Sequence, residues 1–129
     1  MKLPLSSWLV ANGASQDVLR ELQEAVGPLP AAYLSLLALG NGGEVGLSVS
    51  PLTLCLDSAE VALEYWRSGT YTMSGVFVFG GNGGGELLAF DLRNAGEWPV
   101  VAFDPIDPEG SIEVVAPDFD GLLALVEAP

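Results

Sequence analysis

Apolar residues that recur three and four positions apart predict two amphipathic helices in the first third of the chain. Ser15 can cap the first helix, and Gly27-Pro28 ends it in the usual order. The second helix should begin near Pro30, where a proline costs no hydrogen bond, and end at the "GNGG" of residues 40–43. The apolar positions are Val18, Leu19, Leu22, Ala25 and Val26 in the first helix, and Tyr33, Leu34, Leu37 and Ala38 in the second.

Two further helices follow the same spacing. Asp57 and Glu60 have the spacing of a capping box, which opens a helix that Gly69 closes. A last helix should run from about Pro117. The apolar positions are Val61, Ala62, Tyr65 and Trp66 in the third helix, and Phe119, Leu122, Leu123 and Val126 in the last.

The remaining apolar segments have the alternation or the short continuous runs of β-strands. "EVGLSVSPLTLCL" predicts two short strands around Pro51, and "GVFVF", "ELLAFDL", "WPVVAF" and "SIEVVA" predict four more. Short turns join them, so consecutive strands must pair antiparallel, because a parallel pair needs a long crossover. The sequence therefore predicts an α+β fold, a twisted antiparallel β-sheet with helices packed on one face.

The composition fits a single domain that spans residues 1–129. With 50% hydrophobic and 16% charged residues, the chain has the apolar material for one core. No apolar run approaches the roughly 18 residues that cross a bilayer. The start "MKLPLSSWLVANGA" has one basic residue, and Pro4, Ser6 and Ser7 interrupt its apolar stretch, so we interpret it as mature protein. We expect the protein in the cytoplasm.

Net charge narrows the class of partner. Seventeen acidic residues face four basic ones, with no histidine, and the net charge is −13. A surface of this sign repels phosphate, so we expect no nucleic acid as partner. Without a long apolar run we also expect no membrane. It would attract a basic protein and speed the encounter at low salt, although an acidic surface also simply keeps a protein soluble.

The glycine-rich "VFVFGGNGGGELLAFD" fails the tests for a phosphate-binding loop. A dinucleotide fingerprint needs glycines at positions one, three and six, and a start at Gly81 puts Glu86 at the sixth. Gly80 and Gly85 have the spacing of the loop in nucleotide hydrolases, but Glu86 stands where the lysine is needed. A hairpin turn rich in residues that tolerate positive φ accounts for the glycines.

No residue stands out as a catalytic group. "FDPIDPEGSIE" carries Asp104, Asp107, Glu109 and Glu113, but it lacks the spacing of a calcium loop. Without histidine the usual triads and most metal sites are unavailable. Cys55 lies in a strand-like run, where we expect a small buried core residue, and the tryptophans should lie in the core or at its edge. We expect no enzyme activity, no metal and no cofactor.

Four segments occur in a familiar order: "GPLPAAYLSLLALGNGG", "VFVFGGNGGGELLAFDL", "VVAFDPIDPEG" and "VAPDFDGLLALV". The first has Leu-Pro, an aromatic residue, a leucine-rich helix and Asn-Gly, filled by Leu29, Pro30, Tyr33, Leu36, Leu37, Asn41 and Gly42. The second is a strand, a glycine-rich turn and a strand that ends at Asp91, with Gly85-Glu86 where Gly-Asp is common. Over residues 25–127 the chain resembles the SUKH superfamily of immunity proteins and cell-wall-assembly regulators.

This resemblance implies the α+β fold and a glycine-rich turn without a catalytic role. It also implies a non-catalytic protein-binding domain. Bacterial members are mostly implied to be immunity proteins, each of which binds and neutralises a polymorphic toxin, often a nuclease. We therefore expect such a protein here. A regulatory or scaffold module with no toxin partner stays open, as does a small hydrolase that uses carboxylates and a divalent metal.

The partner-binding residues are expected among the acids of two loops in the strand meander: Glu86, Asp104, Asp107, Glu109 and Glu113. Many nuclease domains are basic where they hold nucleic acid, so an acidic loop can steer onto that surface and block it. The alternative for each residue is a solvated acid that contacts no partner. The sequence is silent on oligomeric state.

Overall fold

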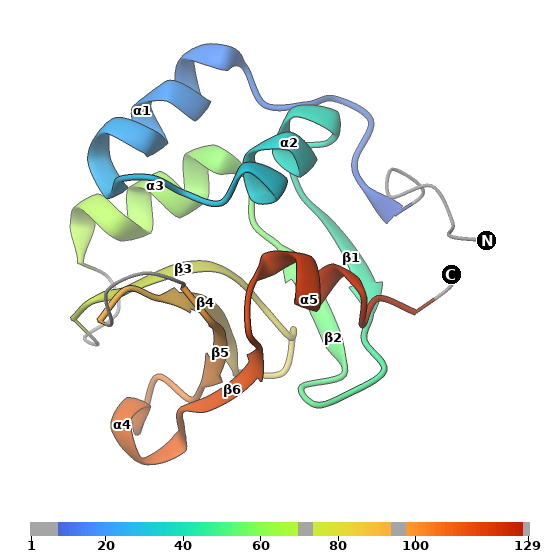
Figure 1. The fold of residues 1–129 in the computed structure, drawn as a ribbon, viewed down its shortest axis with the longest axis vertical. Coiled ribbons are helices and arrows are strands. Elements are labelled where there is room, and N and C mark those ends of the chain that lie inside the picture. The colour runs from blue at the N-terminus through green and yellow to red at the C-terminus, as the bar shows by residue number, and fades with distance from the viewer. Residues whose placement is uncertain (1–7, 70–73, 94–97, 128–129) are drawn as a thin grey trace.

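The computed structural model describes residues 8–69, 74–93 and 98–127 (Figure 1). Lys2 and the rest of residues 1–7, the first half of the N-terminal stretch interpreted above as mature protein, lie outside these residues. The helices are α1 (Gln16–Val26), α2 (Ala31–Leu39), α3 (Ala59–Ser68), α4 (Pro108–Ser111) and α5 (Phe119–Leu123). The strands are β1 (Gly43–Gly46), β2 (Thr53–Leu56), β3 (Val76–Gly81), β4 (Leu87–Asp91), β5 (Val100–Phe103) and β6 (Glu113–Ala116). None of the described helices is long and apolar enough to cross a membrane.

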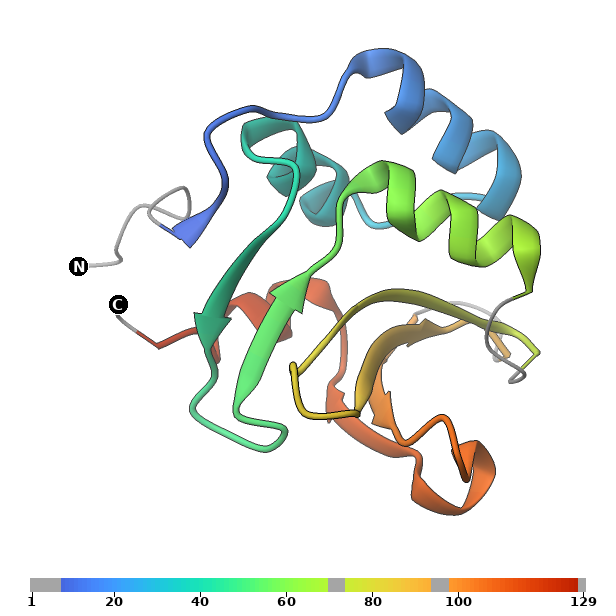
Figure 2. The ribbon, with the colours of Figure 1, turned by 180° about the vertical axis from the view of Figure 1, so that it is seen from behind.

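The six strands form one sheet in chain order, and every neighbouring pair is antiparallel. Figures 1 and 2 show that the sheet curls strongly and that α1, α2 and α3 lie together on one side of it. The predicted α+β class, an antiparallel sheet with helices packed on one face, is confirmed.

Aromatic rings form the centre of the main core. Tyr33 of α2 stands edge-on to Phe90 of β4 and Phe119 of α5, with ring centroids 5.4 and 5.5 Å apart. The ring centroid of Phe79 of β3 lies 4.6 Å from that of Phe90. These rings are almost completely buried, so α2 and α5 are packed on the same face of the sheet. The predicted place of the tryptophans at the core edge is confirmed for Trp8, Trp66 and Trp98, which are partly buried against this cluster.

The helix caps show which local signals hold. Ser15 caps α1 as predicted, because its hydroxyl accepts a hydrogen bond from the amide of Val18 at 3.2 Å. The predicted capping box at Asp57 is wrong. Ser58 is the N-cap of α3, and the side chain of Asn41 accepts from the amide of Ala59 at 2.7 Å. The Asn-Gly of the "GNGG" turn therefore fixes the start of a helix that follows two strands later.

The last helix is shorter than its apolar pattern predicts. α5 begins after its N-cap Asp118 and ends before Val126. Val126 instead forms an antiparallel bridge with Leu47, and the amide of Glu127 donates to the carbonyl of Gly46 at 2.9 Å. Pairing with the outer edge of β1 satisfies backbone groups that another helical turn would have paired within the helix.

The opposite face of the sheet carries a second apolar cluster, which consists of Val76, Val78, Ala89, Val101 and Phe103. The short helix α4, which the sequence does not predict, contacts β5, and Ile112 directly after it packs against this second cluster. A segment interpreted from sequence as an acidic loop therefore also covers apolar surface.

The expectation that Cys55 is a buried core residue is wrong. Its neighbours Leu54 and Leu56 point into the main core, and the period of two along a strand leaves Cys55 on the other face. There it is partly exposed and pairs across the sheet with Glu44 and Gly81.

Candidate protein-binding surface

The glycine-rich connection between β3 and β4 is closed by Asn82. The amide of Asn82 donates to the carbonyl of Glu86 at 3.0 Å, and its side-chain carbonyl accepts from the amides of Gly84 and Glu86 at 2.8 and 3.0 Å. Gly83 and Gly85 have φ of 76° and 111°, which suit glycine in a tight turn. The hairpin turn is therefore confirmed. The amides of Gly84 and Glu86 already donate to the Asn82 side chain, so they are not available to bind a phosphate.

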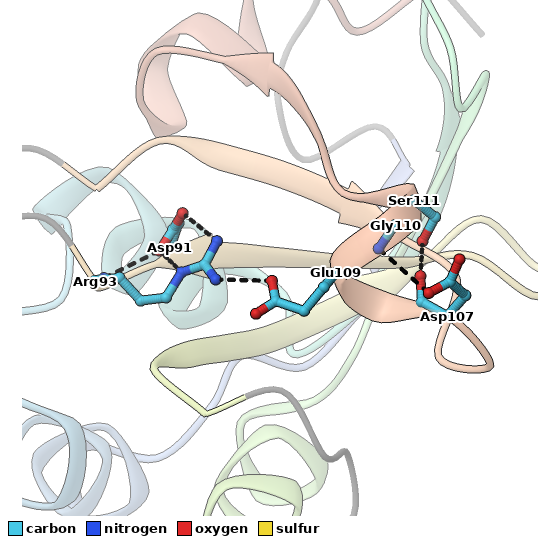
Figure 3. A network of polar contacts seen from close by, with 6 residues as sticks. All are labelled: Asp91, Arg93, Asp107, Glu109, Gly110 and Ser111. Atoms are coloured by element: carbon cyan, nitrogen blue, oxygen red, sulfur yellow. Dashed lines mark hydrogen bonds and ion pairs between the residues drawn. The ribbon is translucent and has the colours of Figure 1, made fainter.

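The acidic loop, residues 104–111, is likewise held by its own side chains. The carboxylate of Asp104 accepts from the amide of Ile106 at 2.9 Å. Asp107 caps α4 by accepting from the amide of Gly110 at 3.3 Å. Ser111 Oγ accepts from the amide of Asp104 at 2.7 Å. The same hydroxyl donates to the carbonyl of Asp107, also at 2.7 Å (Figure 3). Two of the predicted contact residues, Asp104 and Asp107, therefore stabilise the loop.

Arg93 ties the acidic loop to β4 (Figure 3). Its Nε and Nη2 donate to the two carboxylate oxygens of Asp91 at 3.0 and 3.2 Å, and its Nη1 donates to Glu109 at 3.1 Å. Asp91 is only 7% exposed. The hydrogen bonds from Arg93 hold the pKa of Asp91 below its ordinary value although burial opposes this, and the two carboxylates raise the pKa of Arg93.

Replacing Arg93 by methionine should lower the free energy of unfolding by about 1–2 kcal/mol at pH 7, because it leaves Asp91 buried without its partner. The pKa of Asp91 is depressed in the folded state, so the contribution is present above the unfolded value of about 4 and is lost as the pH falls through the folded value. Urea unfolding of both proteins at pH 7 and at successively lower pH measures the difference, which should shrink as Asp91 becomes protonated in the folded state.

Arg20→Met is the matched control, since Arg20 pairs with Asp17 on the exposed surface and such pairs contribute about 0.5 kcal/mol or less. The loss of unfolding free energy in Arg93→Met, relative to wild type, could instead stay the same as the pH is lowered. That result would mean that the arginine acts through packing of its stem against Gly75 and not through Asp91.

The structure brings only part of the predicted contact set together. Leu87 pairs with Phe103, so Glu86 and Asp104, one step beyond each, leave the sheet at the same end. Glu113 pairs with Ala102, whose side chain belongs to the main core, whereas Glu109 reaches Arg93 on the face of the second apolar cluster. Glu113 and Glu109 therefore lie on opposite faces of the sheet.

Every arginine in the described residues already has an acidic partner within the chain. Arg20 pairs with Asp17, Arg67 with Glu21 at 3.3 Å, and Arg93 with Asp91 and Glu109. Of the five predicted contact residues, Glu86, Asp104, Asp107 and Glu113 form no ion pair with another described residue. The negative sign of the surface at the two loops is therefore not neutralised locally.

A family model described as the SMI1 / KNR4 family (SUKH-1) matches residues 13–125, which include every helix and strand in the described part of the chain. The chain belongs to this family. The resemblance carried by the four sequence segments is thereby confirmed. A comparison with curated proteins gave no match. SUKH domains are in general non-catalytic binding domains, and membership fits an immunity-protein-like domain.

The geometry of this SUKH domain offers little to a nucleophilic or metal-assisted reaction. Among residues 8–69, 74–93 and 98–127, no three metal-ligating side chains lie close enough to share an ion. The thiol of Cys55 lies 3.6 Å from a carboxylate oxygen of Glu44, and burial together with that carboxylate raises its pKa. A nucleophile needs the opposite shift. A cavity of about 160 Å³ between α3 and β3 is smaller than ordinary ligand pockets, which hold about 300 Å³ or more.

Sequence reasoning missed the large apolar side chain that is most exposed among the described residues of this SUKH domain. Ile106, at the tip of the acidic loop, is 91% exposed, well above the 69% of Val114 and the 63% of Leu52. The signal was present in "DPIDP". Prolines on both sides keep Ile106 out of a regular helix or strand, so it belongs to no apolar face of either kind.

Proposed function

We propose that residues 1–129 form one SUKH domain that serves as a bacterial immunity protein, binding and neutralising a cognate polymorphic toxin in the cytoplasm without catalysis. The observation that carries this proposal is the family match over residues 13–125. The toxin best suited to it is a basic domain such as a nuclease, since the charge of this chain is −13.

The distribution of charge supports a basic partner. The described arginines are bound within the chain, so they offer little to attract an acidic surface. Glu86, Asp104, Asp107, Glu109 and Glu113 remain the proposed contact residues, and they divide by role. Asp104, Asp107 and Glu109 also hold the acidic loop, whereas Glu113 is exposed without an ion pair in the described residues. Charge reversal at Glu113 should therefore affect binding with the least disturbance of the fold.

Co-expression with the C-terminal domain of the neighbouring gene's product tests the immunity role. The host should survive the toxin domain only when this protein is present, and the purified pair should bind with a dissociation constant in the nanomolar range or tighter. A neighbour that is harmless, or toxic without rescue, would contradict the immunity role and favour a regulatory or scaffold module.

The electrostatic part has its own prediction. Raising the salt from about 50 to 500 mM should weaken the complex at least tenfold, mainly through the association rate, because screening acts on steering. Glu113→Lys should slow association by a similar mechanism, while Glu24→Lys on α1, an exposed acid in the helical layer, is the matched control. Stopped-flow association rates measure both. A flat salt response would remove electrostatic steering from the proposal while leaving the immunity role intact.

A further inference from the structure

Ile106 is held in water by a loop that is already ordered. The carboxylate of Asp104 binds its amide, the amide of Asp107 donates to the carbonyl of Asp104 at 3.1 Å, and Ser111 closes the loop behind it. Pro105 and Pro108 flank the tip and fix their own φ angles. The exposed side chain of Ile106 is therefore presented by a loop whose backbone is held by several hydrogen bonds of its own.

The polar groups around Ile106 serve the loop. Asp104 and Asp107 accept hydrogen bonds from the loop's own amides, and Glu109 is paired with Arg93. These acidic side chains surround the tip, but the side chain exposed at the tip itself is aliphatic. Such a tip combines one apolar group for a pocket with a surrounding field that favours cations.

We infer that Ile106 is the apolar anchor by which this domain docks on its protein partner, inserting into an apolar pocket that basic side chains surround. This inference rests on the proposed protein-binding function and names the residue that carries it. An anchor on an ordered loop loses little conformational entropy on binding, which is the property that makes a single buried side chain a hot spot.

The position of the loop leaves room for a larger contact. Figures 1 and 2 both place α4 and the turn between β1 and β2 at the end of the molecule away from α1 and α3. That turn carries Leu52, 63% exposed, as a second apolar point on the same end. A partner docked at this end would leave α1, α2 and α3 uncovered, so exposed residues of these helices supply controls.

The test compares Ile106→Ser with Leu39→Ser, since Leu39 is 56% exposed at the end of α2 in the helical layer. The probe is the purified C-terminal domain of the neighbouring gene's product. Ile106→Ser should raise the dissociation constant about 10- to 100-fold, mainly through faster dissociation, with an unchanged melting temperature. Leu39→Ser should stay within twofold. A change below threefold for Ile106→Ser would overturn the inference while leaving the proposed function standing.

If the wild-type protein does not bind that domain, the proposed toxin fails and a second measurement decides the anchor. A photo-crosslinking amino acid is placed at position 106 or, as control, at position 39 in the host cell. Support requires a protein captured from 106 and not from 39 that, once identified and purified, binds wild type and loses at least tenfold in affinity with Ile106→Ser. No capture specific to position 106 would overturn the inference.

Discussion

Phe90→Ala will lower the free energy of unfolding by about 4 kcal/mol, which corresponds to roughly 15 °C in melting temperature for a chain of this size. Phe90 of β4 is completely buried. Its ring centroid lies 4.6 Å from that of Phe79, 5.4 Å from that of Tyr33 and 5.7 Å from that of Phe119. These neighbours come from β3, α2 and α5, so the cavity left by the ring cannot be filled by a movement of one element.

Urea unfolding followed by circular dichroism measures the loss. Phe90→Leu keeps much of the volume and should cost about 1–2 kcal/mol. Val114→Ala, on the exposed side of β6, should remain within about 0.5 kcal/mol. A loss below about 2 kcal/mol for Phe90→Ala would show that the rings around it repack, and that the centre of the core lies elsewhere.

Gly80→Ala is expected to cost about 3 kcal/mol although it adds a single methyl group. A Cβ at Gly80 would meet the backbone carbonyl oxygen of Cys55 in the adjacent strand β2, at a separation that two such atoms do not adopt. The obstacle is main chain on both sides, so relief requires β2 and β3 to move apart where Leu56 pairs with Gly80. The cost is therefore in strand pairing.

Gly84→Ala in the same glycine-rich segment is the matched control. The nearest atoms to a Cβ there are those of the Asn82 side chain, at 3.6 Å or more, which is ordinary contact. It should change the free energy of unfolding by no more than about 0.5 kcal/mol. Equal effects of the two substitutions, measured by urea unfolding, would mean that the turn and not the approach of the strands determines the need for glycine.

The sequence predicts those parts of the fold that local signals determine. The cap at Ser15, the proline start of α2 and the order of six antiparallel strands each follow from a few adjacent residues, and the structure has them all. The errors occur where distant groups compete. The sequence predicts Asp57 as the cap of α3, but Ser58 is the N-cap, and Asn41 from another loop binds the first amide of the helix. Val126 fits a helix locally, but it forms an antiparallel bridge with Leu47, directly after β1.

The candidate surface is harder to predict for a physical reason. An acidic residue has the same appearance in sequence whether it faces solvent, caps a helix as Asp107 does, or binds an arginine as Glu109 does. Only the fold assigns these roles, because the cap at Asp107 requires the following residues to be helical and the ion pair of Glu109 requires Arg93, 16 residues away, to lie nearby. Ile106 is the opposite case, since its exposure follows from its having no partner of this kind in the structure described.

That exposure also has an evolutionary consequence. Because Ile106 is 91% exposed and the hydrogen bonds of its loop come from neighbouring residues, folding places almost no constraint on the side chain at position 106. Substitutions there can accumulate because they leave the stability and abundance of the protein unchanged, while they alter the surface that a partner recognises. A lineage could therefore acquire a new binding specificity by a single codon change, without a second mutation to restore the fold.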